Sequence, residues 1–246
     1  MLDALYIGAT GMQAQQLNVD TIANNLANVN TTGFKRDRAN FETLLYQNIR
    51  PAGAQTSEGT QLTTPLSVGT GVRIVNTEKL YSQGGLATTD NALDVAIDGQ
   101  GFLQVLLPDG QIGYTRDGAL SRNAEGTLTT ASGYIVQPEM QIPDGALSVS
   151  ISGDGIVTVT LPGDIEPQEV GQITLATFSN PRGLEPIGEN FLVESSASGP
   201  AVVGNPYADG MGKLVQGALE QSNVNVVQEL VTMIQTQRAY EMNSKA

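Results

Sequence analysis

The chain has 246 residues, no cysteine, no histidine and a formal net charge of −13. The missing residues exclude disulfides, Cys or His nucleophiles and zinc sites built from Cys or His. The negative charge argues against a nucleic-acid partner, and the lack of an 18-residue apolar run argues against membrane insertion.

The N-terminus begins MLDALYIGAT, with an acid at Asp3 and no basic residues before an apolar stretch. This pattern does not fit a cleaved Sec-type signal peptide. Apolar and small residues then recur in a 4-3 alternation, which predicts a coiled-coil helix that ends before Gly33. The seam residues of this helix are Leu5, Ala9, Met12, Gln16, Val19, Ala23 and Leu26.

Residues 35–74 are interpreted as an extended connecting segment. At its start, residues 34–49 could form a short amphipathic helix through Phe41, Leu44, Leu45 and Ile49. The stretch 51–71 is rich in Gly, Thr, Ser and Pro, so we expect it to be ordered only by contacts with neighbouring molecules.

Residues 75–210 predict an all-β domain and contain 17 acidic residues against four basic ones. Asp-Gly pairs between the strands predict type I′ hairpin turns. The expected strands, the first of which begins just before this domain, are 72–76, 93–97, 102–107, 112–116, 127–130, 134–137, 148–152, 156–161, 173–178 and 190–195.

A second heptad pattern occupies the C-terminus, so we expect the segments 1–34 and 211–246 to pair as an α-helical coiled-coil domain. Polar seam residues would fix the register of this pair at some cost in stability. The alternative is two ordinary amphipathic helices packed on the central domain. The seam residues of the second helix are Leu219, Asn223, Val226, Leu230, Met233, Gln237 and Tyr240.

Catalytic, metal and cofactor residues are not expected, and neither is enzymatic activity. Carboxylates are plentiful enough to form a glycosidase pair, but several of them lie in Asp-Gly turns, where a turn role explains them better. Asp-rich loops could bind calcium, yet the D-x-D-x-D-G pattern is absent from the sequence. The overall fold class is therefore mixed α and β, with terminal helices and a central β domain.

Three stretches resemble the flagellar rod and hook protein family, and they are spread over nearly the whole length of the chain. They are ANNLANVNTTGFKR (23–36), DVAIDGQGFLQVLLPDGQIGYTRDGALSRNAEGTLTTASGYIV (94–136) and SNVNVVQELVTMIQTQRAYEMNSKA (222–246). The residues that match the family's N-terminal motif are Asn24, Asn25, Leu26, Asn28, Thr32, Gly33 and Phe34. The length fits the rod-forming members, since hook proteins carry a further large domain.

The resemblance implies a structural subunit that assembles with copies of itself into a hollow helical tube in the flagellar basal body. Its implied neighbours are proximal rod and hook proteins and the periplasmic and outer-membrane bushing rings. It also implies export by the flagellar type III apparatus without a cleaved signal peptide. In such a tube, the amides of the asparagine-rich stretch could hydrogen-bond across interfaces without the cost of burying charge. A proximal rod protein of the same family and a secreted β-rich binding or hydrolytic protein stay open as alternatives.

Overall fold

The computed structural model describes residues 2–50, 52, 55–57, 60–61, 63–163 and 166–245. The chain folds into two compact units, each of which is described by itself. Unit 1 contains residues 1–27, 37–79 and 225–246, and unit 2 contains residues 28–36 and 80–224. These boundaries differ from the expected divisions at 34/35, 74/75 and 210/211.

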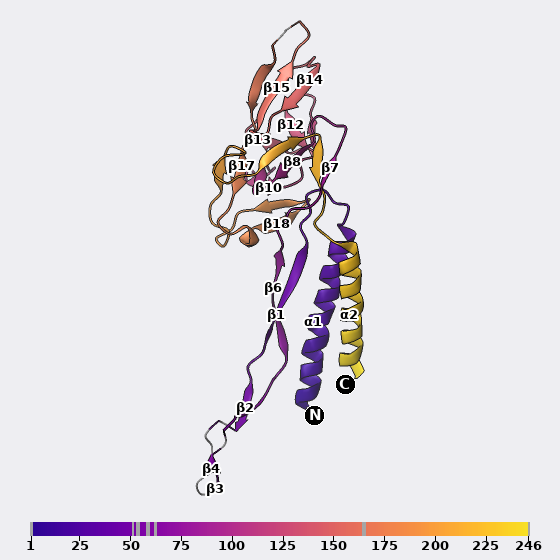
Figure 1. Ribbon diagram of the computed structural model, residues 1–246, viewed down its shortest axis with the longest axis vertical. Coiled ribbons are helices and arrows are strands. Elements are labelled where there is room, and N and C mark those ends of the chain that lie inside the picture. The colour runs from indigo at the N-terminus through magenta and orange to yellow at the C-terminus, as the bar shows by residue number, and fades with distance from the viewer. Residues whose placement is uncertain are drawn as a thin grey trace. The chain divides into compact units, whose positions relative to one another are not determined.

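Two helices of unit 1 lie side by side and run antiparallel, α1 (Leu2–Ala27) and α2 (Val226–Lys245) (Figure 1). Asn225 begins α2, because its side-chain Oδ1 accepts a hydrogen bond from Gln228 N at 3.1 Å. This is the ordinary N-cap role of asparagine. Neither helix among the described residues is long and apolar enough to cross a membrane.

The rest of unit 1 is a series of antiparallel two-stranded ribbons. β1 (Asp37–Thr43) pairs with β6 (Val72–Lys79), β2 (Gln47–Arg50) with β5 (Leu66–Val68), and β3 (Gln55–Ser57) with β4 (Thr60–Gln61). The short helix predicted over 34–49 is therefore wrong. Cross-strand pairs favour the ribbon, since Lys79 Nζ lies 3.0 Å from Asp37 Oδ1 and Asn40 donates to Asn76 at 2.9 Å.

The stretch 51–71 is only partly described. Its residues 51, 53, 54, 58, 59 and 62 lie outside the described residues, whereas β3, β4 and β5 lie within it. The expectation that neighbouring molecules order this stretch stays a prediction.

Unit 2 is built from antiparallel strands. Its largest sheet has nine strands, of which seven follow the order β11-β12-β13-β9-β10-β19-β18, while β17 pairs with both β9 and β20. The strands of this sheet are β9 (Phe102–Leu106), β10 (Ile112–Thr115), β11 (Leu120–Arg122), β12 (Leu128–Thr130), β13 (Ile135–Gln137), β17 (Leu175–Thr177), β18 (Glu185–Gly188), β19 (Phe191–Val193) and β20 (Val202–Gly204).

Smaller sheets and a 3-10 turn make up the rest of the described elements of unit 2. A three-stranded sheet contains β14 (Ser148–Ile151), β15 (Ile156–Thr160) and β16 (Gln168–Gln172). β21 (Lys213–Gln216) pairs with β8 (Val95–Asp98), and β22 (Ala218–Glu220) pairs with β7 (Leu86–Thr88). The turn η1 covers Pro181–Gly183.

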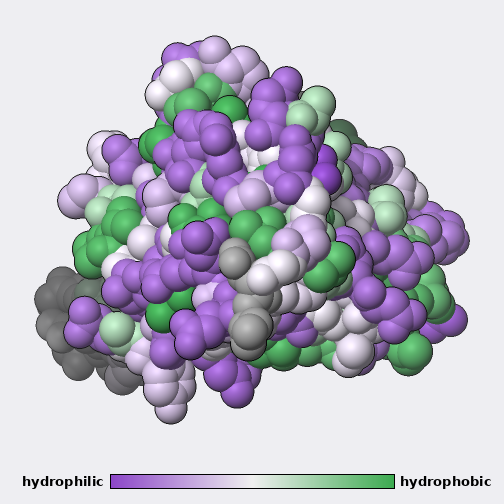
Figure 2. All heavy atoms as spheres, turned by 90° about the horizontal axis from the view of Figure 1, so that it is seen from above, coloured by the Kyte–Doolittle hydropathy of each residue, from purple (hydrophilic) through white to green (hydrophobic). Residues whose placement is uncertain are grey.

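The core of unit 2 is aliphatic, with Leu103, Leu128 and Val136 fully buried. A second cluster is aromatic, and in it Tyr114 meets Phe178 edge-on with ring centroids 4.8 Å apart. On the face seen in Figure 2, hydrophobic residues are scattered among hydrophilic ones.

The Asp-Gly turns differ from the predicted type. Gly99, Gly110, Gly145 and Gly155 have positive φ angles, but Asp98, Asp109, Asp144 and Asp154 do not. Type I′ turns require a positive φ at both central residues, so the type I′ prediction is wrong at these four turns. The strands themselves form where the β-branched and aromatic runs predicted them.

Candidate assembly surfaces

Small and polar residues of α1 contact α2. Asn18 Nδ2 donates to Thr236 Oγ1 at 3.1 Å, and Thr236 is buried. A Cβ on Gly11 would lie 2.9 Å from Asn243 Nδ2, and one on Gly8 would lie 3.6 Å from Asn243 O. The glycines therefore allow the two helices to approach closely.

This contact face also repeats every seven residues. Gly11 and Asn18 of α1 are seven apart, as are Glu229, Thr236 and Asn243 of α2, and both Glu229 and Thr236 are buried. These residues also stand seven apart, but they are small or polar and are not the predicted seam residues, so the predicted coiled-coil pairing is not confirmed. Apolar residues alone could not reveal this contact face.

Most of the predicted seam points away from this intrachain contact. Leu5 is 66% exposed, and the Gln16 side chain donates to Asp20 on its own helix at 3.0 Å instead of across a seam. Ala9, Gln16, Ala23, Val226, Leu230, Gln237 and Tyr240 are exposed, while Met12, Val19, Leu26 and Met233 are half-buried. Whether these residues contact neighbouring copies stays a prediction.

Two predicted seam residues do not belong to a helix. Leu219 lies in β22, where it pairs with Ala87 of β7, and Asn223 lies between β22 and α2. The prediction that the C-terminal helix includes them is wrong. Pairing with β7 satisfies the backbone of Leu219, and Asn223 uses its side chain to bind the backbone of other segments.

The outer face of α2 is apolar and exposed. Val227 is 71% exposed, Leu230 43%, Val231 50% and Ile234 51%, and their spacing of three and four residues places them on one side of the helix. A contiguous apolar row of this kind marks an interaction surface more often than isolated exposed residues do.

One asparagine of the N-terminal motif, Asn25, binds the backbone at the start of β1 through two hydrogen bonds. Asn25 is 1% exposed, its Oδ1 accepts a hydrogen bond from Asp37 N at 2.8 Å, and its Nδ2 donates to Asp37 O at 2.8 Å. A neutral amide can both donate and accept in this way, whereas a carboxylate or ammonium cannot. For Asn25, the amide therefore has a role within the chain, which the sequence analysis missed.

The second half of the motif belongs to unit 2, where backbone approaches backbone. Gly33 has φ +69°, and a Cβ there would lie 2.7 Å from the carbonyl carbon of Arg116. Its N–H donates to Glu220 O at 2.8 Å. Only glycine meets both requirements without strain, and this explains its place in the motif.

A buried ionic cluster of unit 2 links the N-terminal motif to β22, the strand just before the C-terminal motif. Lys35 Nζ lies 2.6 Å from Glu220 Oε1, and Arg116 Nε lies 2.7 Å from Glu220 Oε2. The three side chains are at most 5% exposed. Glu220 Oε1 also accepts a hydrogen bond from Gly84 N at 2.8 Å. We call Lys35, Arg116 and Glu220 the ionic triad.

Electrostatics within the triad determine its protonation. Burial alone would raise the pKa of the Glu220 carboxyl, but Arg116, Lys35 and the Gly84 N–H outweigh that effect, and the pKa is lowered. Burial and the Arg116 charge lower the pKa of Lys35, and Glu220 offsets them only in part. The carboxylate form of Glu220 is therefore the stable one in the folded unit.

Asn223 ties the same region together with neutral hydrogen bonds. Its Oδ1 accepts from Arg36 N at 2.8 Å, and its Nδ2 donates to Leu80 O at 2.7 Å and to Ser82 O at 3.1 Å. The segment that precedes α2 is thus joined, within unit 2, to the segment that follows α1 and to residues 80–82. The sequence pattern predicts that the two ends pair, but through helix heptads alone.

Comparison with known proteins gives three family matches. The flagella basal body rod protein family matches residues 5–35, the D1 domain of flagellar hook protein FlgE/F/G matches 96–159, and the C-terminal region of flagellar basal body rod FlgEFG proteins matches 215–246. These ranges contain most of α1, much of unit 2 and all of α2.

Several relatives are similar over the whole chain. The flagellar basal-body rod protein FlgG of Buchnera aphidicola (subspecies Schizaphis graminum) is 53% identical over 246 residues, which cover 100% of this chain and 95% of the relative. FlgG of Borreliella burgdorferi is 48% identical over 248 residues, with 100% and 94% covered. The chain therefore belongs to the flagellar rod and hook protein family.

Within this family, the chain is a structural subunit of the rod type. FlgG of Bacillus subtilis is 39% identical and 94% covered, whereas the flagellar hook protein FlgE of Helicobacter pylori is 34% identical but only 33% covered. The match in length thus supports a rod subunit and not a hook subunit. None of the three family matches describes an enzyme.

Proposed function

We propose that this chain is the distal rod subunit, which assembles helically into the hollow shaft that transmits torque and conducts exported subunits. The names and lengths of the FlgG relatives support the distal position over a proximal one. The proposal includes neighbouring proximal rod and hook proteins, the bushing rings, and export by the type III apparatus without a cleaved signal.

The exposed apolar row on α2 carries this proposal. Val227, Leu230, Val231 and Ile234 are each at least 43% exposed in the single chain, and burying them would release ordered water. In a helical polymer each subunit covers such a row on its neighbour, and the head-to-tail contact repeats without closing. The exposed part of the predicted seam, including Leu5, would lie in the same inner layer as a coiled-coil contact.

The experiment places a charge on this row. Val231→Asp and Ile234→Asp should abolish assembly of purified subunits, as measured by light scattering and electron microscopy, because each buries an unpaired carboxylate between subunits. Gln235→Asp is the matched control, since Gln235 is an exposed residue of the same helix that is already polar, so that the substitution removes no apolar side chain.

Thermal unfolding of unit 2 should be the same in all three variants, because the substitutions lie in unit 1. Wild-type subunits that never form tubes would refute the proposed function. Normal tubes from both Val231→Asp and Ile234→Asp would refute the assignment of the apolar row.

A further inference from the structure

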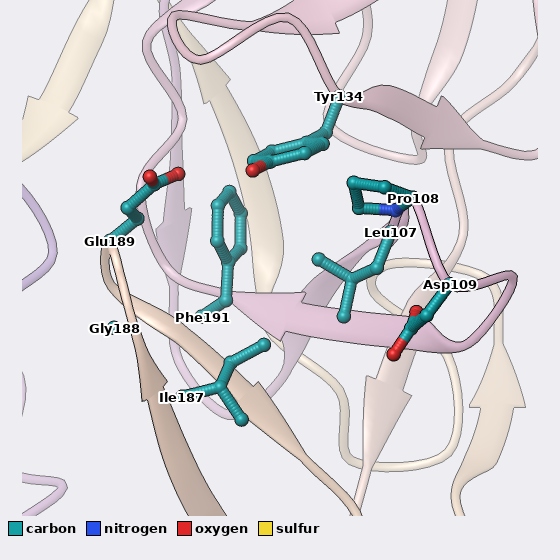
Figure 3. A pocket seen from close by; sticks show the side chains of 8 residues that line it. All are labelled: Leu107, Pro108, Asp109, Tyr134, Ile187, Gly188, Glu189 and Phe191. Carbon is teal, nitrogen blue, oxygen red and sulfur yellow. The ribbon is translucent and has the colours of Figure 1, made fainter.

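Unit 2 has an open pocket of about 310 Å³ whose floor is apolar and whose rim is acidic. Figure 3 shows the Tyr134 ring edge-on to Phe191, and their ring centroids lie 5.1 Å apart at an interplanar angle of 82°. Leu107 and Ile187 add further apolar surface. The carboxylates of Asp109 and Glu189 stand on opposite sides of the opening (Figure 3).

The turn that carries Glu189 has an unusual backbone. Glu189 and Asn190 have φ angles of 51° and 62°, and they connect Gly188 to its cross-strand partner Phe191. Asn-Gly is the usual choice for two successive positive φ angles, whereas glutamate is disfavoured there. Asn190 Nδ2 donates to Thr32 O at 3.1 Å and pins the turn. A strained residue held in place points to a functional role for its side chain.

The charges around the pocket also favour a cationic ligand. The Glu189 charge, with smaller contributions from burial and a hydrogen bond to Glu189, raises the pKa of the Tyr134 hydroxyl. Unit 2 contains 17 acidic and six basic residues in total. The pocket therefore attracts a cation and repels an anion.

A cationic side chain with an apolar stem matches these features. Arginine and lysine place their methylene groups on apolar surface while the charged head stays at the rim. An aromatic ring attracts such a cation, and a carboxylate binds it through charge-assisted hydrogen bonds.

Unit 1 offers such a group on the β2–β5 ribbon. Arg50 of β2 stands directly opposite Leu66 of β5, so their side chains share one face of the ribbon. Leu66 is 51% exposed and Arg50 is exposed. By contrast, the cations Lys35, Arg38, Arg73, Lys79, Arg116 and Lys213 already lie in ion pairs with carboxylates of their own unit.

We propose that the pocket formed by Tyr134, Phe191 and Glu189 receives Arg50 and Leu66 of a second copy of this chain. The contact is heterologous, since the ribbon of one copy enters the pocket of the next, and it can therefore repeat along a polymer. This proposal rests on the proposed function, because it requires self-assembly.

Charge-swapped variants test the contact. Glu189→Lys and Arg50→Glu should each raise the concentration needed for assembly at least tenfold. Glu185→Lys is the matched control, since Glu185 is an exposed acid of β18 in the same hairpin but outside the pocket. It should leave that concentration within threefold of wild type.

Mixing the two variants distinguishes a contact between two copies from a contact within one chain. An equimolar mixture of Glu189→Lys and Arg50→Glu chains should regain assembly, because each pocket can then meet a ribbon of opposite charge. Rescue in the Glu189→Lys/Arg50→Glu double variant without rescue in the mixture would mean an intrachain contact and would overturn the proposal. Assembly of Glu189→Lys at the wild-type concentration would overturn it as well.

These outcomes are separate from failure of the proposed function. If wild-type chains form tubes and the variants do too, only the pocket contact is wrong. If wild-type chains fail to assemble, the proposed function itself is wrong. Thermal unfolding of Glu189→Lys should match that of Glu185→Lys, so that an assembly defect is not a folding defect.

Discussion

Gly11 of α1 and Asn243 of α2 approach so closely that a methyl group on Gly11 would lie 2.9 Å from the Asn243 amide nitrogen. Glycine within a helix costs about 1 kcal/mol relative to alanine. The close helix contact offsets this cost only when α2 packs on α1. The glycine thus makes α1 depend on its partner.

Substitutions at Gly11 test this dependence. Gly11→Leu should raise the concentration needed for assembly about tenfold or more, because overpacking costs about 1–3 kcal/mol. Gly11→Ala is the matched control and should have little effect. The end of the Asn243 side chain can move by a small distance, and alanine favours the helix. Equal behaviour of the two variants would argue against close packing at Gly11.

Removal of the charge on Glu220 should destabilise unit 2 strongly. Glu220→Gln leaves Lys35 and Arg116 buried without their carboxylate, and breaking such a cluster costs about 3–5 kcal/mol. Urea unfolding followed by the fluorescence of the unit 2 tyrosines measures the loss. Glu194→Gln is the control at an exposed position. A Glu220→Gln midpoint equal to that of the control would mean that the triad adds no stability.

Mild acid should affect the stability of unit 2 through two carboxyl groups whose pKa values are shifted in opposite directions. The lowered pKa of Glu220 contributes stability that is present above the ordinary pKa of about 4.3 and is lost as the pH falls through its folded pKa. Burial and the Asp94 charge raise the pKa of Asp117, although a hydrogen bond from the backbone of Ala119 acts in the opposite direction. As the pH falls, Asp117 is therefore protonated in the folded state before it is protonated in the unfolded state, and this adds stability.

Denaturant titrations at several pH values measure both effects. Asp117→Asn should remove the stabilisation seen on mild acidification, and Glu220→Gln should flatten the loss of stability at lower pH. An unchanged profile in Asp117→Asn would show that this carboxyl does not couple to folding.

Amide hydrogen exchange should separate the helices from the strands next to them. Residues 3–27 and 226–245 should exchange fast in the dilute monomer and slowly in the rod, because glycines, asparagines and an exposed apolar face leave the two helices marginal on their own. Residues 213–220 should already be protected in the monomer, since β21 and β22 pair within unit 2. Slow exchange of both helices in the monomer would mean that unit 1 is stable by itself.

The sequence predicted the strands of unit 2 more successfully than the contacts of the helices. Runs such as FLQVLL combine β-branched and aromatic residues with burial on the sheet, so local preference and tertiary packing agree there. In α1 the apolar heptad and the contact face differ, because Gly11 and Asn18 contact α2 through small size and hydrogen bonding. Hydrophobic periodicity does not detect either property.

The remaining misses depend on partners that are distant in the sequence. Residues 34–49 have helical spacing, but pairing with β6 decides the structure of β1. Leu219 continues the heptad spacing of α2, but it lies in strand β22 because it pairs with β7. Lys35 stands in the N-terminal motif, but Glu220 precedes the C-terminal motif, so the motifs did not indicate the ionic triad. Nothing local in the sequence tells that they meet.

The ion pair between Lys35 and Glu220 joins residues that are 185 positions apart in the chain. Contacts of such long sequence separation close late, since the entropy of a large loop must be lost before they form. During synthesis, Lys35 and Arg116 emerge long before the carboxylate that neutralises them. The β-rich unit can therefore complete its fold only when almost the whole chain has been made, and a prematurely terminated chain retains two cations that it cannot bury.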